Sequence, residues 1–468
     1  MKFLNLIQRP SWWVLLLLCA APFVFSAVWN KGFMASDEYW TGIIRYIPAQ
    51  ESAIDKLFVD DDVKSPTQLL PLHAAAQVAL AGGMTHPYQQ YAFVVLILGL
   101  LGTAILFAAF WNFFEDETER RLAFVLLALY FAAPAILTRP MFESMSAPFL
   151  AWAALFAARY DRGARTADLL WGAFFGALAF CLRPQTGICC LIFPLLALGH
   201  RRWKDLGWVS AWGVVLLVLT GLPDLWIRGG FHHSLRALIG YNVEHGSDYG
   251  SQPWWYYLPL LFLLGFGPWW IAKYPAGFWG AYGRRFRAIL WMIVLFVAEH
   301  SLFTHKFERF LIPLVPLIVM LMVPVALHFL SESPRRRWRL ISAAAFGLVL
   351  WGAATFSEPQ GHLIRLVRFF DAHPEITSLQ NVDEALTWLP EVFRVNGRMP
   401  LREASSEGGV VCEGWLIARE PVAEKVRRQD PRWQVQESFR PGVIEFWAYK
   451  LNPKHNVRRA PMSLMKCN

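Results

Sequence analysis

Long apolar runs recur through the first three quarters of the chain and constrain its fold more than any other feature. About 20 apolar residues in a helix cross the roughly 30 Å hydrocarbon layer of a membrane. The chain is 56% hydrophobic and 17% charged, against about 25% charged residues in an average soluble domain. We therefore predict an α-helical polytopic membrane protein with about eleven transmembrane helices, in the runs at 12–29, 88–114, 122–138, 144–158, 168–182, 186–199, 208–227, 254–271, 286–303, 310–330 and 340–356.

The positions of Lys and Arg predict the orientation, because these residues accumulate in cytoplasmic loops. They cluster in alternate loops, which we assign to the cytoplasm: Lys2 and Arg9; Arg159, Arg162 and Arg165; Arg201, Arg202 and Lys204; Arg284, Arg285 and Arg287; Arg335, Arg336, Arg337 and Arg339. The semi-apolar stretch 68–83 is then re-entrant or interfacial. Several runs are short, so some can be paired hairpins that do not cross fully. The first run is a signal anchor or a cleavable signal peptide.

The chain divides into two predicted domains. Residues 1–356 form the transmembrane domain, with a first exoplasmic loop at about 30–87, and residues 357–468 form a small exoplasmic α/β domain. In the latter we expect an amphipathic helix at 378–393, a strand near 409–417, a helix near 420–428 and a hairpin-like pair near 432–450. Cys412 and Cys467 both fall in this domain, where a disulfide is possible because the compartment permits it.

Charge and motifs exclude several classes of function. The net charge of +9 is explained by the cytoplasmic anchors, and no basic stripe carries the interleaved aromatic residues of a nucleic-acid site. We expect no nucleic-acid partner. No dinucleotide or phosphate-loop motif is present, and His232-His233 lacks acidic or Cys companions at metal spacing. We therefore expect neither a cofactor nor a metal.

Five polar motifs lie at the predicted exoplasmic ends of the runs, where we expect them to converge. They are SDEYW (36–40), TRPMFES (138–144), LRPQTG (182–187), EHGSDYGSQPWWYY (244–257) and THKFERF (304–310). Charged groups at one membrane face suggest chemistry on a membrane-embedded substrate. Acidic, basic and aromatic residues at a lipid boundary suit a transferase that acts on a lipid phosphate and a hydroxyl compound.

The acidic pair Asp37-Glu38 provides the candidate catalytic carboxylate. Adjacent side chains on a helix diverge by about 100°, so one of the two is expected to act as general base for an attacking hydroxyl. The alternative is that the pair only keeps the loop in water.

The motif THKFERF provides cations. In a helix, His305 and Arg309 lie on one face, with Lys306 near Arg309, and such a cluster suits a lipid phosphate. The alternative is an interfacial snorkelling cluster in which Glu308 pairs locally.

Two further sets of residues have open roles. Arg139 and Glu143, four residues apart, form a salt bridge or leave Arg139 facing a phosphate, and Arg183 is ambiguous alone. The aromatic stretch with Tyr249, Trp254, Trp255 and Tyr256 is a membrane-interface belt or a platform for a sugar or lipid.

In order and sidedness these motifs resemble the family 22 glycosyltransferases of the GT-C class, the multi-spanning α-mannosyltransferases of glycosylphosphatidylinositol and dolichol-linked oligosaccharides. The resemblance covers roughly residues 10–330, and HKFERFLIPLVP (305–316) is its strongest element. It implies an inverting enzyme with a polyprenyl-phosphate sugar donor, most simply mannose, and a lipid-linked or glycan acceptor. By the same resemblance Asp37 is the base with Glu38 as its companion, and His305, Lys306 and Arg309 form the basic element. Arg139, Glu143 and Arg183 are secondary matches.

Two alternatives remain open. One is a GT-C transferase that uses another polyprenyl-phosphate sugar, and the other is a transporter or flippase for a lipid-linked saccharide, which predicts mid-membrane charges and internal repeats. Compact loops and the lack of a recognisable retrieval tail favour a bacterial inner membrane over the endoplasmic reticulum, with the site facing the periplasm or lumen.

Overall fold

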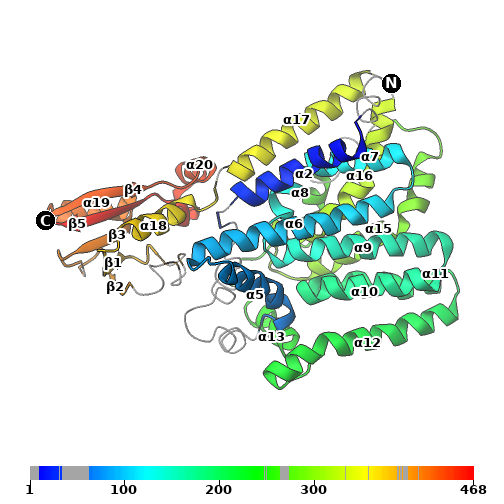
Figure 1. Ribbon diagram of the computed structural model, residues 1–468, viewed down its shortest axis with the longest axis horizontal. Helices are drawn as coiled ribbons and strands as arrows, with labels where there is room; N and C mark the ends of the chain where they lie inside the picture. The colour runs from blue at the N-terminus through cyan, green and yellow to red at the C-terminus, as the bar shows by residue number, and fades with distance from the viewer. Residues whose placement is uncertain are drawn as a thin grey trace. The chain divides into compact units, whose positions relative to one another are not determined.

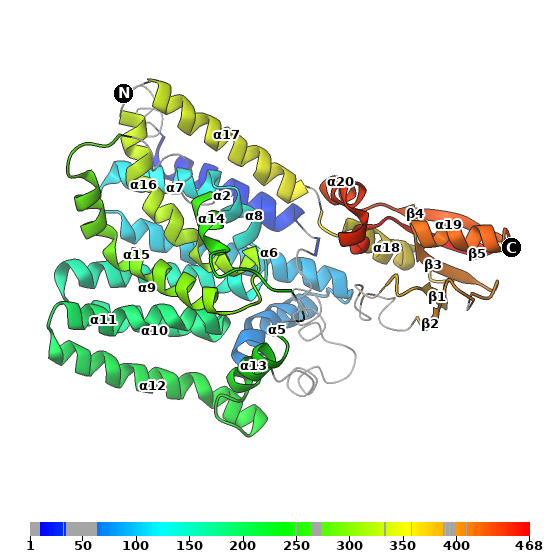
Figure 2. The ribbon, with the colours of Figure 1, turned by 180° about the vertical axis from the view of Figure 1, so that it is seen from behind.

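The computed structural model describes a mostly helical chain with one small sheet (Figures 1 and 2). Its described residues are 10–30, 32–33, 63–246, 248, 250–263, 273–331, 334–356, 358–386, 389, 393, 399–408 and 410–468. The chain forms two compact units. The first comprises Met1–Ala27, Leu57–Leu72 and Val95–Trp351, and the second comprises Val28–Lys56, His73–Val94 and Gly352–Asn468.

Every predicted apolar run contains helix. In chain order the helices are α2 (Trp12–Trp29), α5 (Pro66–Ala81), α6 (Pro87–Phe113), α7 (Glu117–Leu129), α8 (Ala132–Leu137), α9 (Phe142–Gly163), α10 (Thr166–Leu182), the 3-10 helix η2 (Pro184–Leu191), α11 (Ile192–Gly199), α12 (Trp203–Arg228), α13 (His233–Glu244), α14 (Tyr257–Leu261), α15 (Phe278–Leu302), the 3-10 helix η5 (Glu308–Leu314), α16 (Val315–Ser331) and α17 (Pro334–Phe356). The stretch predicted as re-entrant or interfacial is helical, as α5.

The number of crossings stays a prediction. Among the described residues, five helices are long and apolar enough to span a membrane: Trp12–Trp29, Pro87–Phe113, Trp203–Arg228, Glu308–Ser331 and Arg337–Ala372. The last covers α17 and the following helix α18 (Gly361–Ala372). Because α18 is amphipathic and packs on a strand of the second unit, we assign this crossing to α17.

Helix α9 lies inside the first unit between α6 on one side and α10 on the other, and α12 lies beyond α10 (Figure 1). Small residues recur along its buried side at Ala147, Ala151, Ala154 and Ala158, and such spacing lets helices approach closely in a membrane. Glycine has the same role on α10, where a Cβ at Gly172 would lie 2.3 Å from the Phe193 ring.

One end of the first unit gathers arginines from two of the loops that we assign to the cytoplasm. Arg285 makes two hydrogen bonds of 2.6 Å to Glu119, and Arg287 donates to Asp161. Arg202 donates to the carbonyl of Ala164, in a third loop, at 2.6 Å. Contacts of this kind bring these loops together at one end of the helices.

The second unit contains a mixed sheet of five strands in the order β2-β1-β3-β5-β4. The strands are β1 (Leu379–Val382), β2 (Leu401–Ala404), β3 (Trp415–Arg419), β4 (Trp433–Phe439) and β5 (Met462–Cys467). β1 is parallel to β2 and β3, whereas β5 is antiparallel to β3 and β4. With α18, the helices of this unit are α19 (Glu420–Gln429) and α20 (Val443–Leu451), and two 3-10 turns, η7 (Pro453–His455) and η8 (Val457–Arg459), follow α20. The core is built around Val382, Leu416, Val426, Trp433 and Met465.

The element predictions for this unit were partly right. The predicted helix near 420–428 is α19, with Pro421 in its first turn. The predicted helix at 378–393 is wrong at its start, because 379–382 is the buried strand β1. Its polar residues Gln380 and Asn381 are buried and satisfied there: the Gln380 amide donates to the carbonyl of Val411 at 2.7 Å and the Asn381 amide to Glu403 at 2.8 Å.

The predicted hairpin near 432–450 is also wrong. β4 pairs with the C-terminal strand β5, and the second half of the range folds as α20. The predicted strand near 409–417 forms later, as β3.

The disulfide that the sequence left open is present between Cys412 and Cys467, and their Cα atoms lie 5.4 Å apart. It ties the loop before β3 to the end of β5 and closes a loop with a sequence separation of 55.

Replacing Cys412 and Cys467 with Ala is expected to destabilise this sheet by about 2–4 kcal/mol, because the unfolded segment gains conformational freedom. Protease protection of the second unit during thermal unfolding of the purified protein measures the loss of stability. The free-cysteine variant Cys19→Ala is the control. Equal protection of the double variant and the parent chain would contradict a stabilising role for the bond.

Candidate functional site

The motifs EHGSDYGSQPWWYY and THKFERF lie side by side in the first unit. The backbone N–H of Gln252 donates to the carbonyl of Thr304 at 3.0 Å, and the Thr304 hydroxyl donates to the carbonyl of Gly246 at 3.1 Å. The Lys306 ammonium donates to the carbonyls of Gln252, at 3.2 Å, and of Phe303. Lys306 is 4% exposed, and this burial lowers its pKa. Lys306 therefore fixes the two segments against each other.

The aromatic stretch begins in a turn before α14. Trp254 and Trp255 are 69% and 49% exposed, so both rings are available to a membrane surface or to a ligand. The Tyr256 hydroxyl donates to Glu308, which joins the aromatic stretch to η5. Tyr257 is buried.

The motifs TRPMFES and LRPQTG meet in a buried ion pair. Arg183 and Glu143 approach to 3.2 Å, with side chains 10% and 5% exposed. Arg183 ends α10 in an extended conformation, as expected before Pro184, and Glu143 lies in the first turn of α9. A cation at a helix C-terminus and an anion at a helix N-terminus are both favoured by the helix dipoles.

This pairing corrects the local salt bridge that the sequence suggested between Arg139 and Glu143. α8 ends at Leu137 and α9 begins at Phe142, so the two residues do not share a helix. Arg139 is buried in the connection between the two helices.

Cationic side chains from two motifs surround the ring of Phe310. The guanidinium carbons of Arg183 and Arg309 lie 5.1 and 5.7 Å from its centroid, and the His305 ring lies at 5.9 Å. Arg309 and His305 also contact Phe307, at 5.2 and 4.2 Å. We call Arg183, His305 and Arg309 the Phe310 cluster. Two arginines beside an aromatic ring are suited to a phosphate, because the guanidinium group binds phosphate oxygens and stacks on rings.

The conformation behind this cluster differs from the sequence prediction. Residues 305–307 are not helical, and η5 begins only at Glu308. His305 and Arg309 therefore come together through shared contacts with Phe307 and Phe310 and not through one helix face.

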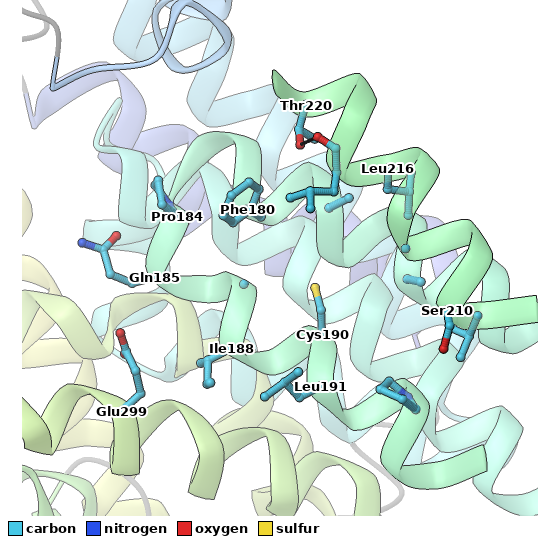
Figure 3. A pocket seen from close by; sticks show the side chains of 17 residues that line it. Phe180, Pro184, Gln185, Ile188, Cys190, Leu191, Ser210, Leu216, Thr220 and Glu299 are labelled. Atoms are coloured by element: carbon cyan, nitrogen blue, oxygen red, sulfur yellow. Dashed lines mark hydrogen bonds between the residues drawn. The ribbon is translucent and has the colours of Figure 1, made fainter. Parts of the chain in front are cut away.

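An apolar cavity of about 520 Å³ lies in the first unit (Figure 3). Its walls come from α10, η2, α11 and α12, and include Phe180, Pro184, Leu191 and Leu216. Two polar side chains, Gln185 and Glu299, lie on one side of it (Figure 3). Pro184 and Gln185, which line the cavity, directly follow Arg183 in the sequence.

The sequence analysis did not identify Glu299 as a candidate site residue. It lies in α15, where it pairs with His300 at 2.5 Å. Glu299 is a lone carboxylate inside the apolar run 286–303. This signal could have identified it, because ionisable residues in such runs are usually functional.

The structure describes some of the predicted site residues, and others lie outside its described residues. It brings together four of the five predicted motifs. Asp37, Glu38 and Tyr249 lie outside the described residues, so the fifth motif and the candidate base have no structural description here.

Comparison with known proteins agrees with the predicted family and the fold. The model of the Alg9-like mannosyltransferase family matches residues 12–375. An undecaprenyl phosphate-alpha-4-amino-4-deoxy-L-arabinose arabinosyl transferase of Pseudomonas fluorescens is 28% identical over 45% of this chain and 40% of its own length. The mouse alpha-1,2-mannosyltransferase ALG9 is 28% identical over 44% of this chain and 38% of its own length. These matches thus span well under half of either relative.

A solved structure shares the fold. The crystal structure of ArnT from Cupriavidus metallidurans bound to undecaprenyl phosphate superposes with a TM-score of 0.54 at 13% identity, over 97% of this chain and 98% of that one. The predicted resemblance to family 22 of the GT-C class is therefore confirmed. The chain belongs to the Alg9-like mannosyltransferase family, a family of membrane glycosyltransferases.

Proposed function

We propose that the protein transfers a sugar, mannose in the first instance, from a polyprenyl-phosphate donor to a hydroxyl of a glycolipid or glycan acceptor at the exoplasmic face. The observation that supports this best is the position of Arg183. It belongs to the Phe310 cluster, and the residues that follow it line the apolar cavity. A lipid phosphate whose hydrocarbon chain lies in the cavity would place its phosphate beside this arginine.

The reaction is a single displacement. The acceptor hydroxyl attacks the anomeric carbon, the bond from that carbon to the phosphate oxygen breaks, and the phosphate leaves on the lipid. Asp37 takes the hydroxyl proton, with Glu38 as its acidic companion. His305, Arg309, Arg183 and Arg139 stabilise the charge that develops on the phosphate, which is the electrostatic role that usually dominates such steps.

The remaining site residues position other groups of the site or contact the substrate. Lys306 holds the loop of Gln252 through backbone carbonyls, and its further donor capacity is available to the donor phosphate. Tyr249, Trp254, Trp255 and Tyr256 form a platform for the sugar or acceptor, because aromatic faces suit such contacts. Glu143 orients Arg183 through their ion pair and lies within reach of the substrate.

The second candidate donor carries an arabinose derivative. It is favoured by the name of the Pseudomonas relative, whereas the family model and the mouse relative favour mannose.

A competition experiment separates the two donors. Purified protein in proteoliposomes receives radiolabelled polyprenyl-phosphate mannose and a lipid extract as acceptor, with unlabelled polyprenyl-phosphate aminoarabinose as competitor. Transfer of mannose that resists the competitor supports the first proposal. Transfer from aminoarabinose alone keeps the donor class and discards mannose, and movement of a lipid-linked saccharide without transfer would favour the flippase.

The compartment in which the site lies is also part of the proposal. We place the site and the C-terminal unit in the periplasm or lumen, with a bacterial inner membrane favoured over the endoplasmic reticulum. The Cys412–Cys467 disulfide supports export, because such bonds persist in oxidising compartments.

A matched pair of variants on α12 tests the role of the cavity. Gly213 lines the cavity, and an added Cβ there meets open space. Gly213→Trp should fill the cavity and raise the KM for the lipid donor at least about tenfold, equivalent to about 1.4 kcal/mol. Gly207→Trp is the control, since Gly207 lies on the same helix with equally open space but away from the cavity. Equal KM values for the two variants would show that the cavity does not hold the donor chain.

A further inference from the structure

Helix α20 of the second unit presents its apolar side outward. Val443, Ile444, Trp447 and Leu451 are 72%, 49%, 60% and 83% exposed. At 100° per residue these four positions fall within one arc of about 100°, the width of the stripe that a helix normally buries. The opposite side carries Glu445 and Tyr449. An exposed ridge of this kind marks an interaction surface.

The inner side of α20 is fixed to the chain that leaves the membrane. The backbone amide of Gln360 donates to Glu445 at 2.6 Å, and Arg459 pairs with the same carboxylate at 3.8 Å. Gln360 follows the last residue of α17, Phe356, by four positions. Four residues span at most about 14 Å, so α20 is tethered close to the membrane end of a candidate span.

The charge beside the ridge identifies the partner. Residues 440–459 contain five Lys or Arg and a single carboxylate, Glu445, which faces inward. Lys450 adjoins the ridge and lies 5.4 Å from the Phe446 ring, and Arg440, Lys454 and Arg458 are also exposed. An apolar stripe with cationic flanks is the pattern of a helix that lies in a membrane interface and attracts anionic lipids.

We propose that α20 is an interfacial anchor that inserts Val443, Ile444, Trp447 and Leu451 into an anionic lipid surface. In this arrangement the basic residues contact lipid phosphates, and the C-terminal unit is held against the membrane at a second point besides α17. The proposal concerns a lipid surface and is independent of the transferred sugar.

Photocrosslinking of the full-length protein tests the proposal. Benzoylphenylalanine replaces Trp447 in protein reconstituted into vesicles of phosphatidylcholine with phosphatidylglycerol, and mass spectrometry identifies the adducts. The matched control is the same probe at Val435, an exposed apolar position on β4, the edge strand of the sheet in the same unit. We expect phosphatidylglycerol adducts at position 447 at least about tenfold above those at 435.

Charge variants complete the test. Lys450→Glu with Lys454→Glu should lower the yield of phosphatidylglycerol adducts at position 447 severalfold. In vesicles of phosphatidylcholine alone, the total yield of lipid adducts at this position should fall to a similar extent. Adducts to a second protein chain, or equal lipid yields at 447 and 435, would overturn the anchor. Yields at 447 that do not depend on lipid charge would overturn the role of the basic residues.

Discussion

Asp37→Asn is expected to lower kcat for sugar transfer by about 10²- to 10⁴-fold, with donor binding unchanged. Asn keeps the shape of the side chain but cannot accept the proton of the attacking hydroxyl, and general-base catalysis contributes a factor of this size. Initial rates with a labelled polyprenyl-phosphate sugar measure the loss, and equilibrium binding of the same donor shows whether the site is intact.

Glu38→Gln is the matched control for this variant, because it removes the neighbouring carboxylate and nothing else. We expect it to cost less than about tenfold in kcat, since one carboxylate of an adjacent pair acts on the substrate. A larger loss in Glu38→Gln than in Asp37→Asn would transfer the role of base to Glu38, and an unchanged rate in Asp37→Asn would end the assignment.

Arg183→Met is expected to lower the free energy of unfolding by about 3–5 kcal/mol. It leaves Glu143 buried without its partner, and a single buried charge is far more costly than a buried pair. Unfolding of the purified protein in mixed micelles, followed by tryptophan fluorescence, measures the loss.

A double variant separates the structural role of Arg183 from its proposed contact with phosphate. Arg183→Met with Glu143→Leu removes both charges, so most of the lost stability should return. Transfer activity should stay low, because the donor phosphate still lacks the contact with Arg183. Recovery of activity together with stability would show that Arg183 only neutralises Glu143.

The sequence predicted the helical membrane architecture and the meeting of the four motifs that the structure describes, because both follow from patterns that are visible along the chain. Apolar runs near 20 residues have few other structures available. Polar motifs at the ends of such runs must lie near one membrane face.

Partners far apart in the chain were harder to predict. Sequence spacing offered Arg139 as the nearest partner of Glu143, whereas the ion pair forms with Arg183 across the interface of α9 and α10. The prediction that His305 and Arg309 lie on one helix face was wrong for a related reason. Thr304 and Lys306 bond to the segment around Gln252, and these tertiary contacts override a local helical preference.

The C-terminal unit shows the same limit. Gln380 and Asn381 resemble the polar face of a helix, but their side-chain amides are buried in β1 and donate to residues that come later in the chain, Val411 in a loop and Glu403 in β2. The apolar residues of α20 resemble a strand because Val and Ile begin it, yet β4 takes its partner from residues 462–467.

The position of β5 has a consequence for biosynthesis. This strand pairs with both β3 and β4, so the sheet is incomplete until residues 462–467 have been made. Until then β3 and β4 each expose an edge of unpaired backbone groups, which is a template for aggregation. The C-terminal unit therefore has to be kept apart from neighbouring chains during synthesis, and loss of β5 would leave it open to misassembly.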